Sequence, residues 1–416
     1  MALLGAMIKT SMAALLTLVA VALPAEAATF AMKRGLNLDQ WTTWTGEEKW
    51  NDPNAILPYP EWRKYLKGND LKALKDAGFD FLRMPVDPAP FLSDETLSLR
   101  DDLYASVRDS ARMINRAGLK VIVDLHLIPA GGSRKIGMSE VMDDPETFDA
   151  YAELVRKMAR TLSQEDPGQV ALELMNEPIV DCDEKGTNLW PDRQKTLFAA
   201  ARSSATRLTL ILTGGCYSNA ASLAKIDPKT IPDDNIIWAF HSYDPFLLTH
   251  QGATWAGDFI RYVTGLPFPL TAVPQAQLDV ALDTIRAHIK AEAPWTRRSG
   301  MLAYLDEQVA SMDSDDKLLG IMDAPFKTVE AWAQANGIRP ENITLGEFGM
   351  IRQEYGNSYV MPAKYRAAYV RDMIARAEAH GFSWSVWGYG GAFGIVDAFD
   401  GERAEPDVMD VIRSLR

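Results

Sequence analysis

The chain has 416 residues, of which 47% are hydrophobic and 24% charged, a composition typical of a globular protein. The net charge of −13 and the lack of any Lys/Arg-rich run argue against a nucleic-acid or anionic-membrane partner. The two cysteines are too few for a disulfide scaffold, and no metal-binding motif such as His-Glu-x-x-His is present. We therefore expect neither a metal nor another cofactor.

The first 27 residues predict a signal peptide. Lys9 supplies a positive charge, Met12 to Leu23 form an apolar run, and Ala25-Glu26-Ala27 is a small-residue cleavage site. The apolar run is too short to cross a bilayer, which needs about 20 residues. We expect an exported protein, periplasmic or secreted, without a membrane anchor; a buried N-terminal helix is the alternative.

After residue 27, short segments rich in Val, Ile, Leu and Phe alternate with amphipathic segments of helical spacing, which predicts a parallel sheet with helical crossovers. The predicted strands are Arg34–Leu38, Phe79–Val86, Lys120–His126, Val170–Glu177, Thr209–Thr213, Ile236–Tyr243, Ile343–Phe348 and Phe382–Trp387. The predicted helices are Asp70–Ala77, Asp101–Ala117, Pro145–Leu162, Pro191–Arg207, Pro274–Ala291, Ser299–Val309, Phe326–Asn336 and Ala363–His380.

Eight strands with intervening helices predict an α/β fold, a closed (β/α)8 TIM barrel forming one domain over residues 28–416. Gly78, Gly118 and Gly381 follow three of the helices and suit a left-handed helix end. An open doubly wound sheet is the alternative, although the glycine-rich phosphate turn of its nucleotide-binding form is missing after the first strand.

A long insertion, residues 244–342, separates the sixth and seventh predicted strands. A connection of this length at the rim of a barrel favours a part in the binding site. His250 and Trp255 are the candidate substrate contacts within it. A small structural subdomain packed on the barrel is the alternative interpretation.

The ends of the predicted strands carry polar or aromatic residues where a core would be apolar. They are Arg83, His126, Asn176, Glu177, His241, Tyr243, Glu347 and Trp387. The carboxyl ends of all strands in a parallel barrel meet at one rim, where substrates bind. Each residue alone has a structural explanation, such as an ion pair or a satisfied histidine, but together they predict a site in which two glutamates face each other, as glycosidic bond cleavage requires.

These residues resemble those of glycoside hydrolase family 5, the cellulase family A of the clan-A barrels, from Arg34-Gly35-Leu36-Asn37 to Trp387. The resemblance implies that Glu177, in Asn-Glu-Pro, is the acid/base and that Glu347, in Gly-Glu-Phe-Gly, is the nucleophile of a retaining enzyme. The implied supporting residues are Arg83, His126, Asn176, His241, Tyr243 and Trp387. Trp384 is the alternative to Trp387 as the ring that stacks on the sugar.

The acid/base and the nucleophile are expected to need different electrostatic surroundings. One carboxyl must be protonated while the other is ionised, so their surroundings must separate their pKa values. Arg83 and Tyr243 are expected to favour the ionised form of Glu347 by charge and by a hydrogen bond. Glu177 needs a less polar setting, and Asn176 is expected to bind the sugar 2-hydroxyl.

The resemblance implies a hydrolase that cleaves a β-linked glucan, like an endo-β-1,4-glucanase or cellulase, with a β-linked oligo- or polysaccharide as its partner. A mannanase, a β-1,3-glucanase, a transglycosylase and a non-hydrolytic carbohydrate-binding protein remain alternatives. The glycan and endo against exo action stay open. We expect a monomer.

Cys182 and Cys216 each follow one of two neighbouring strands, and either a disulfide or two buried thiols fits.

Overall fold

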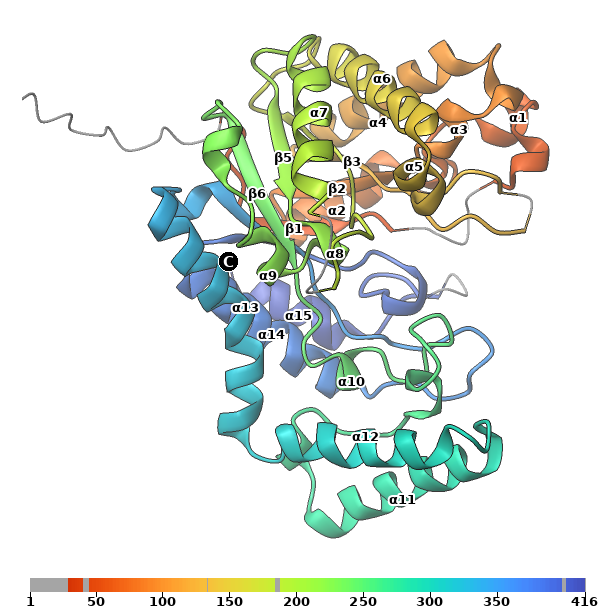
Figure 1. The fold of residues 1–416 in the computed structure, drawn as a ribbon, viewed down its shortest axis with the longest axis vertical. Helices are drawn as coiled ribbons and strands as arrows, with labels where there is room; N and C mark the ends of the chain where they lie inside the picture. Colours follow the sequence, from red (N-terminus) through yellow and green to blue (C-terminus); the bar gives the residue numbers. More distant parts are fainter. Residues whose placement is uncertain (1–28, 40–44, 133, 184–187, 399–401, 416) are drawn as a thin grey trace, which may run out of the picture.

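A closed barrel of eight parallel strands forms the centre of the molecule (Figure 1), and its computed structural model describes residues 29–39, 45–132, 134–183, 188–398 and 402–415. Each strand pairs with the next along the chain, and β8 closes the barrel against β1. The strands are β1 (Arg34–Asn37), β2 (Phe81–Val86), β3 (Lys120–Leu125), β4 (Val170–Glu173), β5 (Thr209–Thr213), β6 (Ile236–His241), β7 (Ile343–Glu347) and β8 (Ser383–Val386). The predicted TIM barrel is confirmed, whereas the predicted signal peptide lies outside the described residues.

Helices connect the strands and surround the barrel. The helices of the crossovers are α2 (Gly68–Ala77), α4 (Arg100–Arg116), α6 (Pro145–Leu162), α7 (Trp190–Arg202), α9 (Ala220–Leu223), α13 (Asp315–Asn336) and α14 (Ala363–Ala379), and α15 (Pro406–Ser414) follows β8. Shorter helices in the loops are α1 (Pro53–Ile56), α3 (Ala89–Leu92), α5 (Met138–Asp143) and α8 (Gly215–Ser218). Among the described residues, no helix combines the length and apolar character that a membrane crossing requires.

Three helices end at the predicted glycines, whereas one helix starts before its predicted first residue. Gly78, Gly118 and Gly381 have φ angles of 117°, 82° and 74°, the left-handed conformation expected at these ends. Helix α13, however, starts at Asp315 rather than at the predicted Phe326, and Pro325 lies inside it. Proline removes one backbone donor and disfavours a helix interior, but apolar residues on both sides of Pro325 pack into the core and keep the helix continuous.

Strand β4 ends at Glu173, four residues before its predicted end at Glu177. The apolar residues Leu174 and Met175 continue the strand pattern, and the Asn176 N–H still donates to Leu125 O at 2.9 Å. Glu177 then adopts a left-handed conformation with φ 41°, which a strand cannot contain. The predicted strand end was therefore wrong, and Glu177 lies on a turn above the strand.

The barrel interior has an apolar layer at its amino-terminal end. Its members are Phe30, Met32, Phe81, Ile122, Ala171, Ile211, Ile237 and Ala239. Because strand side chains alternate with a period of two, the next inward position above Phe81, Ile122 and Ala171 belongs to Arg83, Asp124 and Glu173. The apolar layer therefore supports a charged layer that is itself buried.

The long insertion has two parts of different character. Its first part, with α10 (Phe246–Thr249), stays close to the barrel, because His250 packs against Tyr243 with ring centroids 5.0 Å apart. Its second part contains α11 (Gln275–Glu292) and α12 (Arg298–Ser311), which lie together at one end of the molecule, away from the strands (Figure 1). The first part of the insertion therefore adjoins the barrel, and the helices α11 and α12 of the second part lie apart from the strands.

Candidate active site

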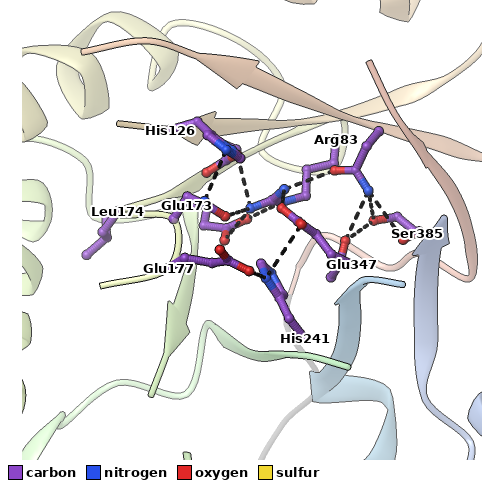
Figure 2. A network of polar contacts seen from close by, with 12 residues as sticks. Arg83, His126, Glu173, Leu174, Glu177, His241, Glu347 and Ser385 are labelled. Carbon is purple, nitrogen blue, oxygen red and sulfur yellow. Dashed lines mark hydrogen bonds and ion pairs between the residues drawn. The ribbon is translucent and has the colours of Figure 1, made fainter. Parts of the chain in front are cut away.

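Arg83 is the centre of a buried network of charges at the carboxyl end of the barrel (Figure 2). Its Nε and Nη2 donate to Glu173 Oε2 and Oε1 at 2.7 and 2.9 Å, and its Nη1 donates to Glu347 Oε1 at 2.7 Å. Asp124 Oδ2 lies 3.0 Å from Nη2. One guanidinium therefore faces three carboxyl groups, and its pKa is raised because their attraction outweighs the cost of burial.

A chain of directional hydrogen bonds fixes the amide of Asn176. Its Oδ1 accepts from Arg83 Nη2 at 2.7 Å, and its Nδ2 lies 3.1 Å from His126 Nε2. The other ring nitrogen of His126 lies 2.7 Å from Asp124 Oδ2. Burial lowers the pKa of His126 to about 3, so its ring is neutral, with Nδ1–H donating to Asp124 and Nε2 accepting from Asn176.

Glu347, the last residue of β7, is buried and receives two donors, one on each oxygen. Arg83 binds Oε1, and the Tyr243 hydroxyl donates to Oε2 at 2.9 Å. Both contacts favour the ionised carboxylate. Burial is nevertheless the larger effect, and the pKa of Glu347 lies above its ordinary value, with Arg83 opposing that rise.

Glu177 lies across the site from Glu347 and has a different environment. Its Oε1 is 2.8 Å from Nδ1 of His241, and its side chain is 27% exposed (Figure 2). Burial raises the pKa of Glu177 to about 7. An oxygen of Glu177, an oxygen of Glu347 and a nitrogen of His241 all lie within 4.8 Å of one another. A metal could use these atoms as ligands, but the Arg83 guanidinium already supplies a positive charge to Glu347.

The two tryptophans near the end of β8 have opposite surroundings. Trp387 is 7% exposed and stacks on the His126 ring, with centroids 5.5 Å apart and planes at 25°. Trp384 is fully buried in the apolar core outside the barrel, against Phe348. Only Trp387 therefore faces the network, and the alternative ring, Trp384, has no access to a ligand.

Trp255 lies on an aromatic cluster that adjoins the site. It packs against His250 and Phe393 with ring centroids 5.4 and 6.4 Å apart, and both of these rings contact Tyr243. Trp255 is 60% exposed, whereas His250 is buried. The cluster connects the exposed indole ring of Trp255 to Tyr243, whose hydroxyl donates to Glu347.

A disulfide joins Cys182 to Cys216, in the loops after β4 and β5. The two loops also share backbone hydrogen bonds: the Cys216 N–H donates to Val180 O at 2.8 Å, and the Tyr217 N–H donates to Pro178 O at 3.2 Å. Pro178 directly follows Glu177. These contacts brace the turn that holds Glu177 in its left-handed conformation.

Sequence reasoning did not assign three members of the network. Glu173, Asp124 and Asn37 were not among the predicted site residues. Asn37 Oδ1 accepts from Arg83 Nη1 at 2.9 Å. The alternation within strands was the available signal, because it places Asp124 and Glu173 inward, two residues after Ile122 and Ala171.

A family model described as Cellulase (glycosyl hydrolase family 5) matches residues 39–392. The chain belongs to glycosyl hydrolase family 5. The resemblance inferred from the strand ends is thus confirmed. Two relatives are Cellodextrinase A of Ruminococcus flavefaciens, 31% identical over 198 residues (47% of this chain, 56% of that protein), and Endoglucanase 3 of Fibrobacter succinogenes, 23% identical over 345 residues (80% and 47%). The chain spans about half the length of both relatives.

Solved structures of similar fold cover nearly the whole family 5 chain. The Clostridial cellulose synthase subunit Z of Clostridioides difficile has a TM-score of 0.63 at 20% identity, covering 92% of this chain and 99% of that one. Cel5A of Thermotoga maritima, in complex with cellobiose, has a TM-score of 0.60 at 19% identity, covering 92% and 97%. At these identities the likeness shows the shared barrel fold.

Proposed function

We propose that this family 5 protein is a retaining β-glucan hydrolase of the endo-β-1,4-glucanase type, with Glu177 as acid/base and Glu347 as nucleophile. The spacing of the two carboxyl groups carries the proposal. Retaining enzymes hold them about 5–5.5 Å apart, whereas inverting enzymes need about 6.5–9.5 Å to admit a water. One oxygen of Glu177 lies within 4.8 Å of one oxygen of Glu347, a close approach that favours the shorter spacing of retaining enzymes.

The reaction would proceed by two displacements. Glu177 donates its proton to the glycosidic oxygen while Glu347 attacks the anomeric carbon, so that the carbon–oxygen bond to the leaving sugar breaks and a glycosyl-enzyme forms. Glu177, now ionised, takes a proton from water, and the hydroxide attacks the same carbon and releases Glu347. The raised pKa of Glu177, about 7, suits a group that alternates between acid and base.

The supporting residues would bind the sugar at the cleavage point. The Asn176 amide, fixed between Arg83 and His126, is our candidate for the sugar 2-hydroxyl, and Trp387 is our candidate platform beneath the ring. The choice of a β-1,4-linked glucan follows the names of the relatives, which are a cellodextrinase and an endoglucanase.

Proton NMR of a cello-oligosaccharide during early hydrolysis tests the mechanism. We expect the β-anomer of the new reducing end to appear first, and an initial α-anomer would exclude retention. Glu347→Gln should reduce turnover at least about 1,000-fold while its circular dichroism spectrum remains that of the unchanged protein. Full activity of this variant would contradict the nucleophile assignment.

Product analysis with β-1,4-glucan, mixed-linkage glucan, β-1,3-glucan, mannan and xylan tests the substrate. Faster cleavage of mannan or β-1,3-glucan would favour those alternatives, and transfer to added sugar acceptors would indicate a transglycosylase. Oligosaccharide binding in calorimetry without any product would indicate a binding protein.

We also propose export to the periplasm or the medium, and a monomeric enzyme. The features of residues 1–27 and the Cys182–Cys216 disulfide support an oxidising compartment outside the cytosol. N-terminal sequencing of the mature protein should begin at Ala28, and light scattering after gel filtration should give the mass of one chain. An intact N-terminus in the producing cell's cytosol would contradict export.

A further inference from the structure

Strand β7 has one residue more than β6 at the level of the site. Leu345 pairs with Phe240 and Glu347 pairs with His241, so Gly346 has no partner across the ladder. Such a bulge shifts the alternation of side chains by one residue. Leu345 packs in the core outside the barrel, yet Glu347, two residues later, points into the site. The bulge at Gly346 is what turns Glu347 inward.

A glycine is required at the bulge because the His241 side chain lies close to it, not because of the backbone conformation. The φ angle of Gly346 lies outside the left-handed region, so other residues could adopt it. A β-carbon at this position would, however, lie 2.9 Å from Nε2 and 3.1 Å from Cδ2 of His241. The first distance is shorter than β-carbon contacts in proteins and the second is tighter than most, so the buried His241 ring would have to shift.

The His241 ring makes a single hydrogen bond among the described residues, and its Nδ1 also lies 3.8 Å from Glu347 Oε2. Its Nδ1 lies 2.8 Å from Glu177 Oε1, whereas its Nε2 has no hydrogen-bond partner there. Burial lowers the pKa of His241 to about 4, so the ring is neutral. A proton on Nε2 would be an orphaned buried donor, which is costlier than an unpaired lone pair. The proton therefore sits on Nδ1 and is donated to Glu177.

We propose that Gly346 is a positioning residue for Glu177: its missing side chain leaves the space in which His241 directs Nδ1–H at Oε1. This inference rests on the proposed acid/base role of Glu177. With Oε1 accepting from His241, the catalytic proton of Glu177 is carried on Oε2. The bulge thus orients both glutamates, Glu347 by the shift in strand alternation and Glu177 through the histidine.

Gly346→Ala tests the proposal, with Gly320→Ala as the matched control, because a β-carbon on Gly320 in α13 meets nothing within 4 Å. Gly346→Ala should lower kcat on unactivated glucan about 10-fold, a part of the factor of about 100 to 10,000 that general acid catalysis supplies. The kcat on activated aryl glycosides should fall by a smaller factor. The basic limb of the pH profile should move to higher pH, because Glu177 loses a donor that favours its ionised form.

A double-mutant cycle separates this role from a general packing defect. In a His241→Ala background the new β-carbon has room, since its next neighbour, the Ala239 Cβ, is 3.9 Å away. Adding Gly346→Ala there should change kcat by less than about twofold. An equal loss in both backgrounds would overturn the proposal.

A spectroscopic measurement tests Gly346 without relying on glucan hydrolysis. The chain has five histidines, and the ¹⁵N-labelled ring signal of His241 can be assigned by its absence in His241→Ala. This signal should shift in Gly346→Ala and stay in place in Gly320→Ala. An unmoved signal would refute the positioning role even if hydrolysis is found, whereas a shift without any glycosidase activity would count against the proposed function alone.

Discussion

Glu173 and Arg83 form a two-point ion pair inside the barrel, with Nε–Oε2 and Nη2–Oε1 distances of 2.7 and 2.9 Å. This pair fixes the plane of the guanidinium, and the remaining Nη1 is thereby aimed at Glu347. Glu173 is itself buried and thus acts on the site from one layer below it.

Glu173→Gln tests this indirect influence. The negative charge of Glu173 raises the pKa of Glu177, so its removal should shift the basic limb of the kcat/KM profile to lower pH. The free energy of unfolding should fall by about 1–3 kcal/mol, because Arg83 loses a charged partner. Glu165→Gln, which breaks a contact with Arg112 outside the barrel, should leave the profile unchanged, and a profile unaltered by Glu173→Gln would contradict this role.

The pH dependence of the unchanged enzyme should be bell-shaped. Activity needs a protonated Glu177, so it should fall as the pH rises through about 7. Activity also needs an ionised Glu347, whose pKa is raised by burial, so the acid limb should lie above the ordinary range of a glutamate. With activated aryl glycosides, Glu177→Ala should lose the basic limb, and its persistence would assign that limb to another group.

The Cys182–Cys216 disulfide should affect both stability and the acid step. It closes a segment with a sequence separation of 34, and chain entropy then predicts a loss of about 4 kcal/mol in unfolding free energy for Cys182→Ala/Cys216→Ala. Because the bridged loops brace the Glu177 turn, this double variant should lose more activity on unactivated glucan than on activated aryl glycosides. An equal loss of activity on both substrates would indicate that the disulfide contributes to stability alone.

Trp255 should contribute to binding rather than to chemistry. Loss of its exposed ring in Trp255→Ala should raise KM for longer cello-oligosaccharides about 2- to 13-fold, the equivalent of about 0.5–1.5 kcal/mol of stacking, with little change in kcat. Trp295→Ala provides the control, because Trp295 is 82% exposed in the connection between α11 and α12. Equal effects of both substitutions would contradict a substrate contact at Trp255.

Much of the fold could be predicted because its signals are local. The apolar run Thr209–Thr213 is a strand with the predicted bounds, and Pro145–Leu162 is a helix with the predicted bounds. Pro325 shows where local reasoning fails, since packing on both sides of it overrides the cost of one missing backbone donor. Local propensity determines elements, and tertiary contacts adjust their ends.

The sequence by itself determined the eight-stranded barrel and was enough to propose the two glutamates and most of their neighbours as site residues, because residue type and spacing are properties of the chain. Only the tertiary structure decided how the side chains of these residues are oriented. The left-handed turn at Glu177, the bulge at Gly346 and the ion pair between Arg83 and Glu173 depend on contacts between strands far apart in sequence. Such contacts leave no periodic signal, because each is set by the register of two strands and by the space between particular side chains.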